Sequence, residues 1–93
     1  MKQIELKDIG YNNKMIVALK SLNDTFQPII VKVKKIGARI WFVDSENYYH
    51  ITELMNFVKG VDINGKTIRE LLVFDSIEEC QKWCDFENEI RKL

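Results

Sequence analysis

Residues 29–44, which read IIVKVKKIGARIWFVD, constrain the fold of this 93-residue chain more than any other segment. Apolar and polar residues alternate on both sides of Gly37, and a period of two is typical of strands with one buried face. A four-residue loop that pairs Lys34 with Arg39 collects nearly all the apolar side chains on one face. The expected partners on this face are Val33 with Ile40, Val31 with Phe42, and Ile29 with Asp44, and those on the other face are Lys32 with Trp41 and Ile30 with Val43. A slip by one residue would mix the two faces, so the pattern predicts both the hairpin and its register.

A two-residue loop at Ile36 and Gly37 would keep the same faces, but it would push Ile36 towards a positive φ. β-Branched residues resist that conformation, so the longer loop is expected. Two earlier segments also read as strands, because residues 4–7 alternate and residues 15–19 (MIVAL) are apolar on both faces. We expect the second of these strands to be covered on both sides or to lie in the middle of the sheet.

The stretch KGVDINGKTIRELL, residues 59–72, can be read as part of a helix-turn-helix or as a hairpin. The dipeptide Asn64-Gly65 is a strong hairpin signal, because both residues tolerate positive φ. The expected pairs are Ile63 with Lys66, Asp62 with Thr67, and Val61 with Ile68, followed by a buried strand at LLVF. The alternative is a helix, since TIRE at residues 67–70 is itself a capping box. A helix-turn-helix is disfavoured, because the gap after Gly60 exceeds the usual turn of about three to four residues.

Two other segments carry the period of a helix. Residues 51–58 place Ile51, Leu54, Met55 and Val58 on one face, which predicts a short helix that ends near Gly60. SIEE at residues 76–79 is a capping box, in which the Ser76 hydroxyl and the Glu79 carboxylate satisfy N–H groups at a helix start. The apolar stripe of this C-terminal helix is Ile77, Cys80, Trp83, Cys84 and Ile90.

These elements predict one α+β domain over residues 1–93. Its expected architecture is an antiparallel meander sheet of four to five strands, with the short helix and the C-terminal helix packed on one face. The central hairpin and the last helix each have a single apolar face, so we expect those faces to meet in one core. The expected members of that core are Val17, Leu19, Val31, Val33, Ile40, Phe42, Ile77, Cys80 and Trp83.

Signals of catalysis are nearly absent from the sequence. The single histidine, His50, is expected at a strand or helix junction rather than as a general base or a metal ligand. Cys80 and Cys84 offer two thiolates one helical turn apart, but zinc needs four ligands and no second pair of Cys or His exists. The cysteines are therefore expected to be reduced core residues. We expect no enzyme activity, no cofactor and no metal.

One surface has the composition of a binding site. The hairpin face opposite the apolar one carries Lys32, Lys34, Arg39 and Trp41, with Lys35 at the loop. Lys34 and Arg39, placed opposite each other, repel unless an anion lies between them. Trp41 can stack a nucleic-acid base or contact a cation. The alternative is a solvated face whose charges are balanced by Glu5 or Glu46.

Tyr48 and Tyr49 form a second candidate contact site, because tyrosine is enriched at protein interfaces. Fourteen Lys and Arg offset fourteen Asp and Glu, which excludes a strongly basic duplex binder and an acidic DNA mimic. We therefore expect a non-catalytic binding protein that occupies a protein partner, as a phage- or mobile-element-type inhibitor or accessory factor does. Single-stranded nucleic acid is the alternative partner. The start MKQIELKD lacks the apolar core of a signal peptide and no apolar run is long enough to span a membrane, so a cytoplasmic protein is expected.

Overall fold

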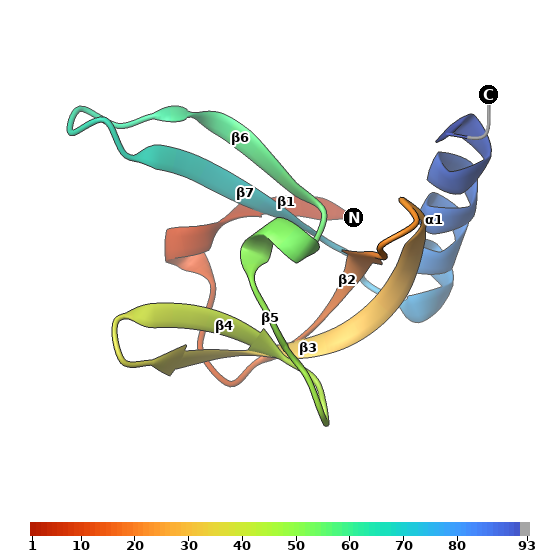
Figure 1. The fold of residues 1–93 in the computed structure, drawn as a ribbon, viewed down its shortest axis with the longest axis horizontal. Helices are drawn as coiled ribbons and strands as arrows, with labels where there is room; N and C mark the ends of the chain where they lie inside the picture. Colours follow the sequence, from red (N-terminus) through yellow and green to blue (C-terminus); the bar gives the residue numbers. More distant parts are fainter. Residues whose placement is uncertain (92–93) are drawn as a thin grey trace.

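The computed structural model describes residues 1–91, and these form two antiparallel sheets and one C-terminal helix (Figure 1). One sheet is a meander of β2 (Lys14–Lys20), β3 (Phe26–Ile36), β4 (Arg39–Val43) and β5 (Tyr48–Tyr49). The other has the order β1 (Lys2–Glu5), β7 (Thr67–Val73), β6 (Asn56–Val61). The remaining elements are the 3₁₀ turns η1 (Leu6–Asp8) and η2 (Ile51–Glu53) and the helix α1 (Ile77–Arg91). The predicted α+β class and the antiparallel meander are confirmed, but the strand predicted at residues 4–7 lies in the other sheet, as β1, and ends at Glu5.

The two sheets share one core. Val17, Val31, Val33 and Phe42 of the meander are at most 1% exposed, and they cluster with Ile9, Leu54, Leu71 and Val73. Two isolated bridges, Ile16 with Phe74 and Leu19 with Leu54, join β2 to the segments beside β7 and β6. The apolar face of the central hairpin is therefore the core face, as predicted. The layer that covers it is the second sheet, and not helix α1.

Helix α1 packs on the opposite face of the meander, so the prediction of one common core is wrong. A second cluster contains Ala18, Phe26, Leu72, Phe74, Cys80 and Cys84, with Trp83 packed against it. Side chains alternate across a strand, so Ala18 points away from its neighbour Val17. Both clusters exist because β7 is buried on both faces, with Leu71 in the first and Leu72 in the second. Ile77, which is 43% exposed, belongs to neither cluster.

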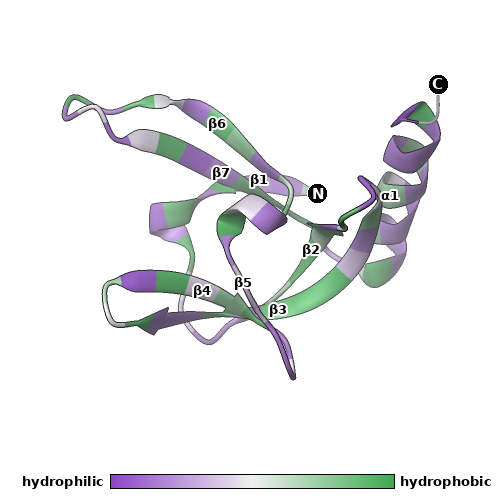
Figure 2. Ribbon diagram, viewed as in Figure 1, coloured by the Kyte–Doolittle hydropathy of each residue, from purple (hydrophilic) through white to green (hydrophobic). Residues whose placement is uncertain are grey.

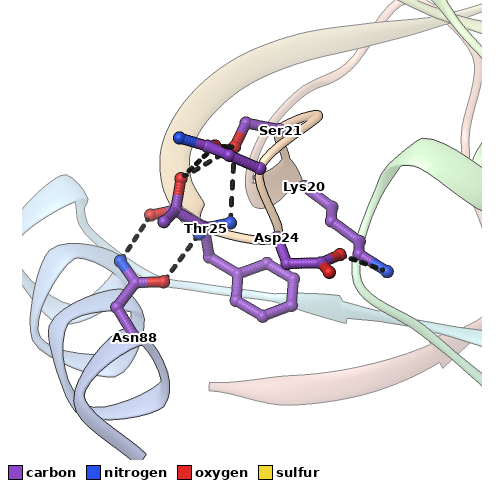
Figure 3. Close-up of polar contacts among 7 residues, drawn as sticks. Lys20, Ser21, Asp24, Thr25 and Asn88 are labelled. Atoms are coloured by element: carbon purple, nitrogen blue, oxygen red, sulfur yellow. Dashed lines mark hydrogen bonds and ion pairs between the residues drawn. The ribbon is translucent and has the colours of Figure 1, made fainter. Parts of the chain in front are cut away.

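Polar contacts fix both ends of α1. At its start the Ser76 hydroxyl accepts a hydrogen bond from the Glu79 N–H at 3.1 Å, and the Glu79 carboxylate accepts one from the Asp75 N–H at 3.2 Å. The predicted capping box is therefore present, except that the Glu79 carboxylate accepts the N–H of Asp75 and not that of Ser76. Towards its end, Asn88 points at the start of β3, beside the loop that carries Ser21 and Thr25 (Figure 3).

The turn between β3 and β4 differs from the predicted one. Ile36 pairs with Arg39, so the loop contains two residues and the register is displaced by two from the expected pairing. The objection to a short loop does not apply here, because the positive φ of 63° falls on Gly37 and Ile36 stays in the strand. Glycine at the first of two loop residues is the usual solution in tight hairpins. A displacement by two leaves every side chain on its predicted face.

The stretch at residues 59–72 is a hairpin, which confirms the preferred reading over a helix. Its pairing is displaced by one residue from the expected register, since Val61 lies opposite Thr67. The Asp62 N–H donates to the Lys66 carbonyl at 2.8 Å, and the Asp62 carboxylate accepts the N–H groups of Asn64 and Lys66. These bonds close a loop of residues 63–65 with Gly65 at φ 80°, a three-residue hairpin with a positive-φ residue at its end.

The short helix predicted for residues 51–58 is wrong. Only Ile51–Glu53 forms a 3₁₀ turn, and the chain then continues as β6 against β7. The Met55 N–H donates to the Ala18 carbonyl and the Leu72 N–H donates to the Met55 carbonyl, so Met55 links the two sheets. The helical spacing of the apolar residues is real, but the pairing of β6 with β7 outweighs it, as tertiary contacts often outweigh a local pattern.

Candidate binding face

The basic–aromatic face is the part of the meander's outer surface that α1 leaves uncovered. We define it by the side chains of Lys14, Lys32, Lys34, Arg39, Trp41, Tyr48 and His50. In the strand register Lys14 lies opposite Lys32, Lys32 opposite Val43, and Val43 opposite Tyr48. The next row along the hairpin sets Lys34 opposite Trp41. Figure 2 shows how the hydrophobic part of β3 gives way to a hydrophilic part near the β3–β4 turn.

The cations of this face have no acidic partners. Within residues 1–91, none of Lys14, Lys32, Lys34 and Arg39 forms an ion pair. Glu5, which was considered as a balancing charge, instead pairs with Lys59 at 2.7 Å and with Lys7 at 3.4 Å. Glu46 forms no ion pair in the same part of the chain, so neither glutamate neutralises the face.

Three aromatic rings gather beside these cations. The ring of Trp41 lies 4.3 Å from that of His50 and 6.1 Å from that of Tyr48, centroid to centroid. Tyr48 is 54% exposed and His50 is exposed, whereas Trp41 is partly buried beneath them. The predicted contact of Lys32 with Trp41 is wrong, because the two-residue turn sets Lys34 opposite Trp41 instead.

Two of the predicted site residues lie elsewhere. Lys35 pairs with Ile40 in the strand and therefore lies on the opposite side of the hairpin from Lys34. Tyr49 packs against the first core, and its hydroxyl donates a hydrogen bond to Asp44 at 3.1 Å. Burial and the Asp44 carboxylate raise the pKa of the Tyr49 hydroxyl. Strand alternation places Tyr48 and Tyr49 on opposite faces, so they do not form the predicted joint contact site.

Two members of the face were missed from the sequence. Lys14 lies one residue before the strand predicted at residues 15–19, and only its pairing with Lys32 on the neighbouring strand shows that it belongs here. His50 follows β5, where it is exposed and its ring lies against that of Trp41 at an interplanar angle of 46°. The one available signal for Lys14 was its even spacing from Ile16 and Ala18, which would have extended the strand by one residue.

A shallow depression of about 340 Å³ marks the lysine-rich end of the face. It is lined by Lys14, Ile30, Val31, Lys32, Lys34, Val43, Asp44 and Ser45. The Asp44 carboxylate is occupied by its own loop, because it accepts the N–H groups of Glu46 at 2.9 Å and Asn47 at 2.7 Å. These hydrogen bonds lower the pKa of Asp44 and keep it ionised. The depression is therefore lined by three lysines and one ionised carboxylate, and none of the four forms an ion pair within residues 1–91, so its net charge is positive.

The chain is neutral overall, but its charges are segregated on this side of the molecule. Strands β2, β3 and β4 carry no acidic residue, and four of their six basic residues lie at the hairpin end of this face, whereas Lys35 lies on the opposite face and Lys20, near α1, pairs with Asp24. Helix α1, which covers the neighbouring part of the same sheet face, carries five acidic residues and two basic ones. An anionic ligand is therefore attracted to the hairpin end and repelled from the helix end. The net charge of zero therefore results from basic and acidic regions that lie apart on the surface.

The remaining candidates have less to support them. Cys80 and Cys84 are fully buried, and the Cys80 thiol lies 3.5 Å from the Val17 carbonyl. Burial is the main cause that raises the pKa of Cys80 to about 12, so it is not a reactive thiolate. No cluster of metal-binding side chains occurs among the described residues. A groove of about 410 Å³ between the β3–β4 and β6–β7 hairpins is lined by acidic and basic side chains together, so it does not favour a ligand of either charge.

Comparisons of the chain with models of known protein families, with curated proteins and with solved structures find no match. Among residues 1–91, no helix is both long enough and apolar enough to cross a membrane. The chemistry of the basic–aromatic face is therefore the main guide to function.

Proposed function

We propose that the protein is a non-catalytic binding protein that occupies a macromolecular partner through the basic–aromatic face. The observation that carries this proposal is the group of four cations on one exposed face, none of which forms an ion pair within residues 1–91. Lys14 and Lys32 lie directly opposite each other, and like charges in that position destabilise a sheet. A negatively charged partner that covers the face removes this repulsion. The contact surface of the partner is therefore anionic.

A protein with an acidic patch is one candidate for this partner. Ile30 and Ile36 are 47% and 49% exposed on the same side of β3 as the lysines. Apolar and aromatic side chains within a polar rim are typical of protein interfaces. A small inhibitor or accessory factor of phage or mobile-element type, which the sequence led us to expect, would act in this way by covering a functional surface of its partner.

Affinity capture from a cell lysate of the source organism tests the proposal. Immobilised wild-type protein is expected to retain a stoichiometric partner, and the double variant Lys32→Glu/Lys34→Glu is expected to lose it. The matched control is Lys35→Glu/Lys66→Glu, which reverses two exposed charges outside the face and should keep the partner. Equal capture by both double variants would show that binding occurs on another surface. Parallel samples with and without nuclease show whether nucleic acid is the retained species.

A further inference from the structure

We infer that the partner of the basic–aromatic face is single-stranded nucleic acid, bound with its phosphates along the lysines and its bases on the aromatic rings. This inference rests on the proposed function and assigns the chemical class of the partner. The feature that points to it is the separation of the three lysines from the aromatic rings, although Arg39, the fourth cation, shares β4 with Trp41. Lys14, Lys32 and Lys34 lie on β2 and β3, whereas Trp41, Tyr48 and His50 lie on β4, on β5 and directly after β5.

The two groups form neighbouring lanes that run along the strands. Adjacent strands are about 4.8 Å apart, and side chains on one face recur roughly every 7 Å along a strand. One row across the sheet contains Lys14, Lys32 and Tyr48, and the next contains Lys34 and Trp41, whose ring lies 4.3 Å from the tilted ring of His50. Each row therefore has positive charge on one side and an aromatic ring on the other.

A single strand of nucleic acid has the same division, because its charge lies along the backbone and its rings project to one side. Proteins that bind single strands commonly combine a positive track with aromatic stacking platforms. An acidic protein patch has no such separation of charge from rings. Duplex DNA fits less well, since its bases are stacked on each other and do not reach Tyr48 or His50.

The acidic helix α1 sets one limit of the site. It packs over Ala18 and Phe26, on the same sheet face as the lysine lane, and repels phosphates from that end. The nucleic acid is therefore confined to the Lys14 end of β2, the β3–β4 hairpin and β5. Arg39 lies at the other end of the face, next to the hairpin turn, where it can contact a further phosphate. The site is suited to a short single-stranded segment and not to a long duplex.

Fluorescence anisotropy with the full chain and a labelled oligothymidylate of about 12 nucleotides tests this inference. We expect a Kd below about 100 μM near physiological salt, with log affinity falling linearly with log salt concentration. Lys32→Gln should reduce the magnitude of that slope by roughly 0.7, the value for one phosphate contact on a single strand. Tyr48→Ala should weaken binding by roughly 5- to 150-fold and leave the slope unchanged. Circular dichroism of each variant confirms that the fold is retained.

Matched controls lie outside the face. Lys35→Gln removes a charge from the opposite side of the same hairpin, and Tyr11→Ala removes a tyrosine that is 50% exposed near β2. Both should bind as the wild type does. Any one of three results overturns the inference. These are a Kd above about 100 μM, equally tight binding of a duplex of the same length, and equal losses of affinity in the control and the site variants. If lysate capture still depends on Lys32 and Lys34 in that case, the proposed function stands with a protein partner.

Discussion

The side-chain amide of Asn88 makes two hydrogen bonds with the backbone of Phe26, although 62 positions separate them in the chain. Its oxygen accepts from the Phe26 N–H at 2.7 Å, and its nitrogen donates to the Phe26 carbonyl at 3.0 Å. The Asn88 amide thus provides the two hydrogen bonds that a neighbouring strand would otherwise give to Phe26 at the start of β3. The contact ties the last turns of α1 to the meander, where Phe26 also packs against Trp83.

Replacement of Asn88 by Ala should therefore destabilise the protein. We expect the free energy of unfolding to fall by about 1–3 kcal/mol, because two backbone groups of the buried Phe26 lose their partner. This loss should appear even though Ala is the better helix former. Urea denaturation measures it. The control is Glu89→Ala at the next, exposed helix position, which should be nearly neutral. An Asn88→Ala variant as stable as the wild type would show that the paired hydrogen bonds contribute little.

The sequence predicts the strands that alternate, but not the layer that covers them. The apolar face of Val31, Val33 and Phe42 follows from local periodicity alone and is the core face in the structure. What covers that face depends on β7, which lies about 30 residues further along the chain and is buried on both sides. The helix predicted at residues 51–58 is absent for a related reason. Their helical spacing is a local pattern, and the strand pairing that replaces it is long-range.

The sequence predicts those members of the candidate site whose positions follow from strand alternation within the β3–β4 hairpin. Lys32, Lys34, Arg39 and Trp41 share a face because the hairpin keeps its parity, even though its turn differs from the expected one. Lys35 was placed at the loop, and the two-residue turn moves it into the strand on the other side. Lys14 requires the pairing of β2 with β3, which no local pattern supplies.

The two-residue turn makes a prediction about Gly37. Its φ is 63°, and a Cβ added there would meet no atom within 4 Å, so a substitution costs conformational energy without a clash. We expect Gly37→Val to lower the free energy of unfolding by about 1–2 kcal/mol, since β-branched residues resist positive φ. Gly37→Asn should cost less, because Asn tolerates this conformation. Equal unfolding midpoints for the two variants would contradict the assigned turn.

The cysteines are expected to be structural. Both are fully buried in the cluster between α1 and the sheet, with their sulfur atoms 4.0 Å apart. Replacing both with Ala should cost about 1–3 kcal/mol of stability, with ligand binding retained. A thiol reagent should react slowly with the native protein at neutral pH, because the pKa of Cys80 is raised to about 12, and quickly once the protein is denatured. Stoichiometric zinc in the purified protein would contradict this assignment.

The ion pairs of Lys59 predict a dependence of stability on acid pH. Lys59 lies at the irregularity in β6 and contacts Glu5 at 2.7 Å and Glu70 at 3.3 Å. The hydrogen bond from Lys59 is the largest cause that lowers the pKa of Glu5 below its ordinary value of 4.5. Because the folded-state pKa is the lower one, this stabilisation is present above pH 4.5 and is lost as pH falls through the folded value.

The variant Lys59→Met should therefore be less stable than the wild type near neutral pH. The difference between the two should shrink as pH falls below 4.5, where Glu5 becomes protonated in both. Thermal unfolding at a series of pH values measures this convergence. Lys66→Met, in the β6–β7 loop, removes an exposed charge that makes no ion pair within residues 1–91 and should show no such trend. A constant difference across the acid range would show that Lys59 stabilises through packing alone.

The opposed pair of Lys14 and Lys32 predicts that a binding residue reduces stability in the free protein. Like charges directly opposite each other on adjacent strands are destabilising, by roughly 0.2–1 kcal/mol. Lys32→Gln should therefore raise the free energy of unfolding by a few tenths of a kcal/mol while it weakens ligand binding. The gain should be largest at low salt and should disappear at about 1 M salt, where charges are screened within about 3 Å. Lys35→Gln, opposite the uncharged Ile40, should change neither stability nor binding. A loss of stability in Lys32→Gln at every salt concentration would mean that Lys32 stabilises the fold. Its exposed charge, which forms no ion pair within residues 1–91, would then no longer be an argument for an anionic partner.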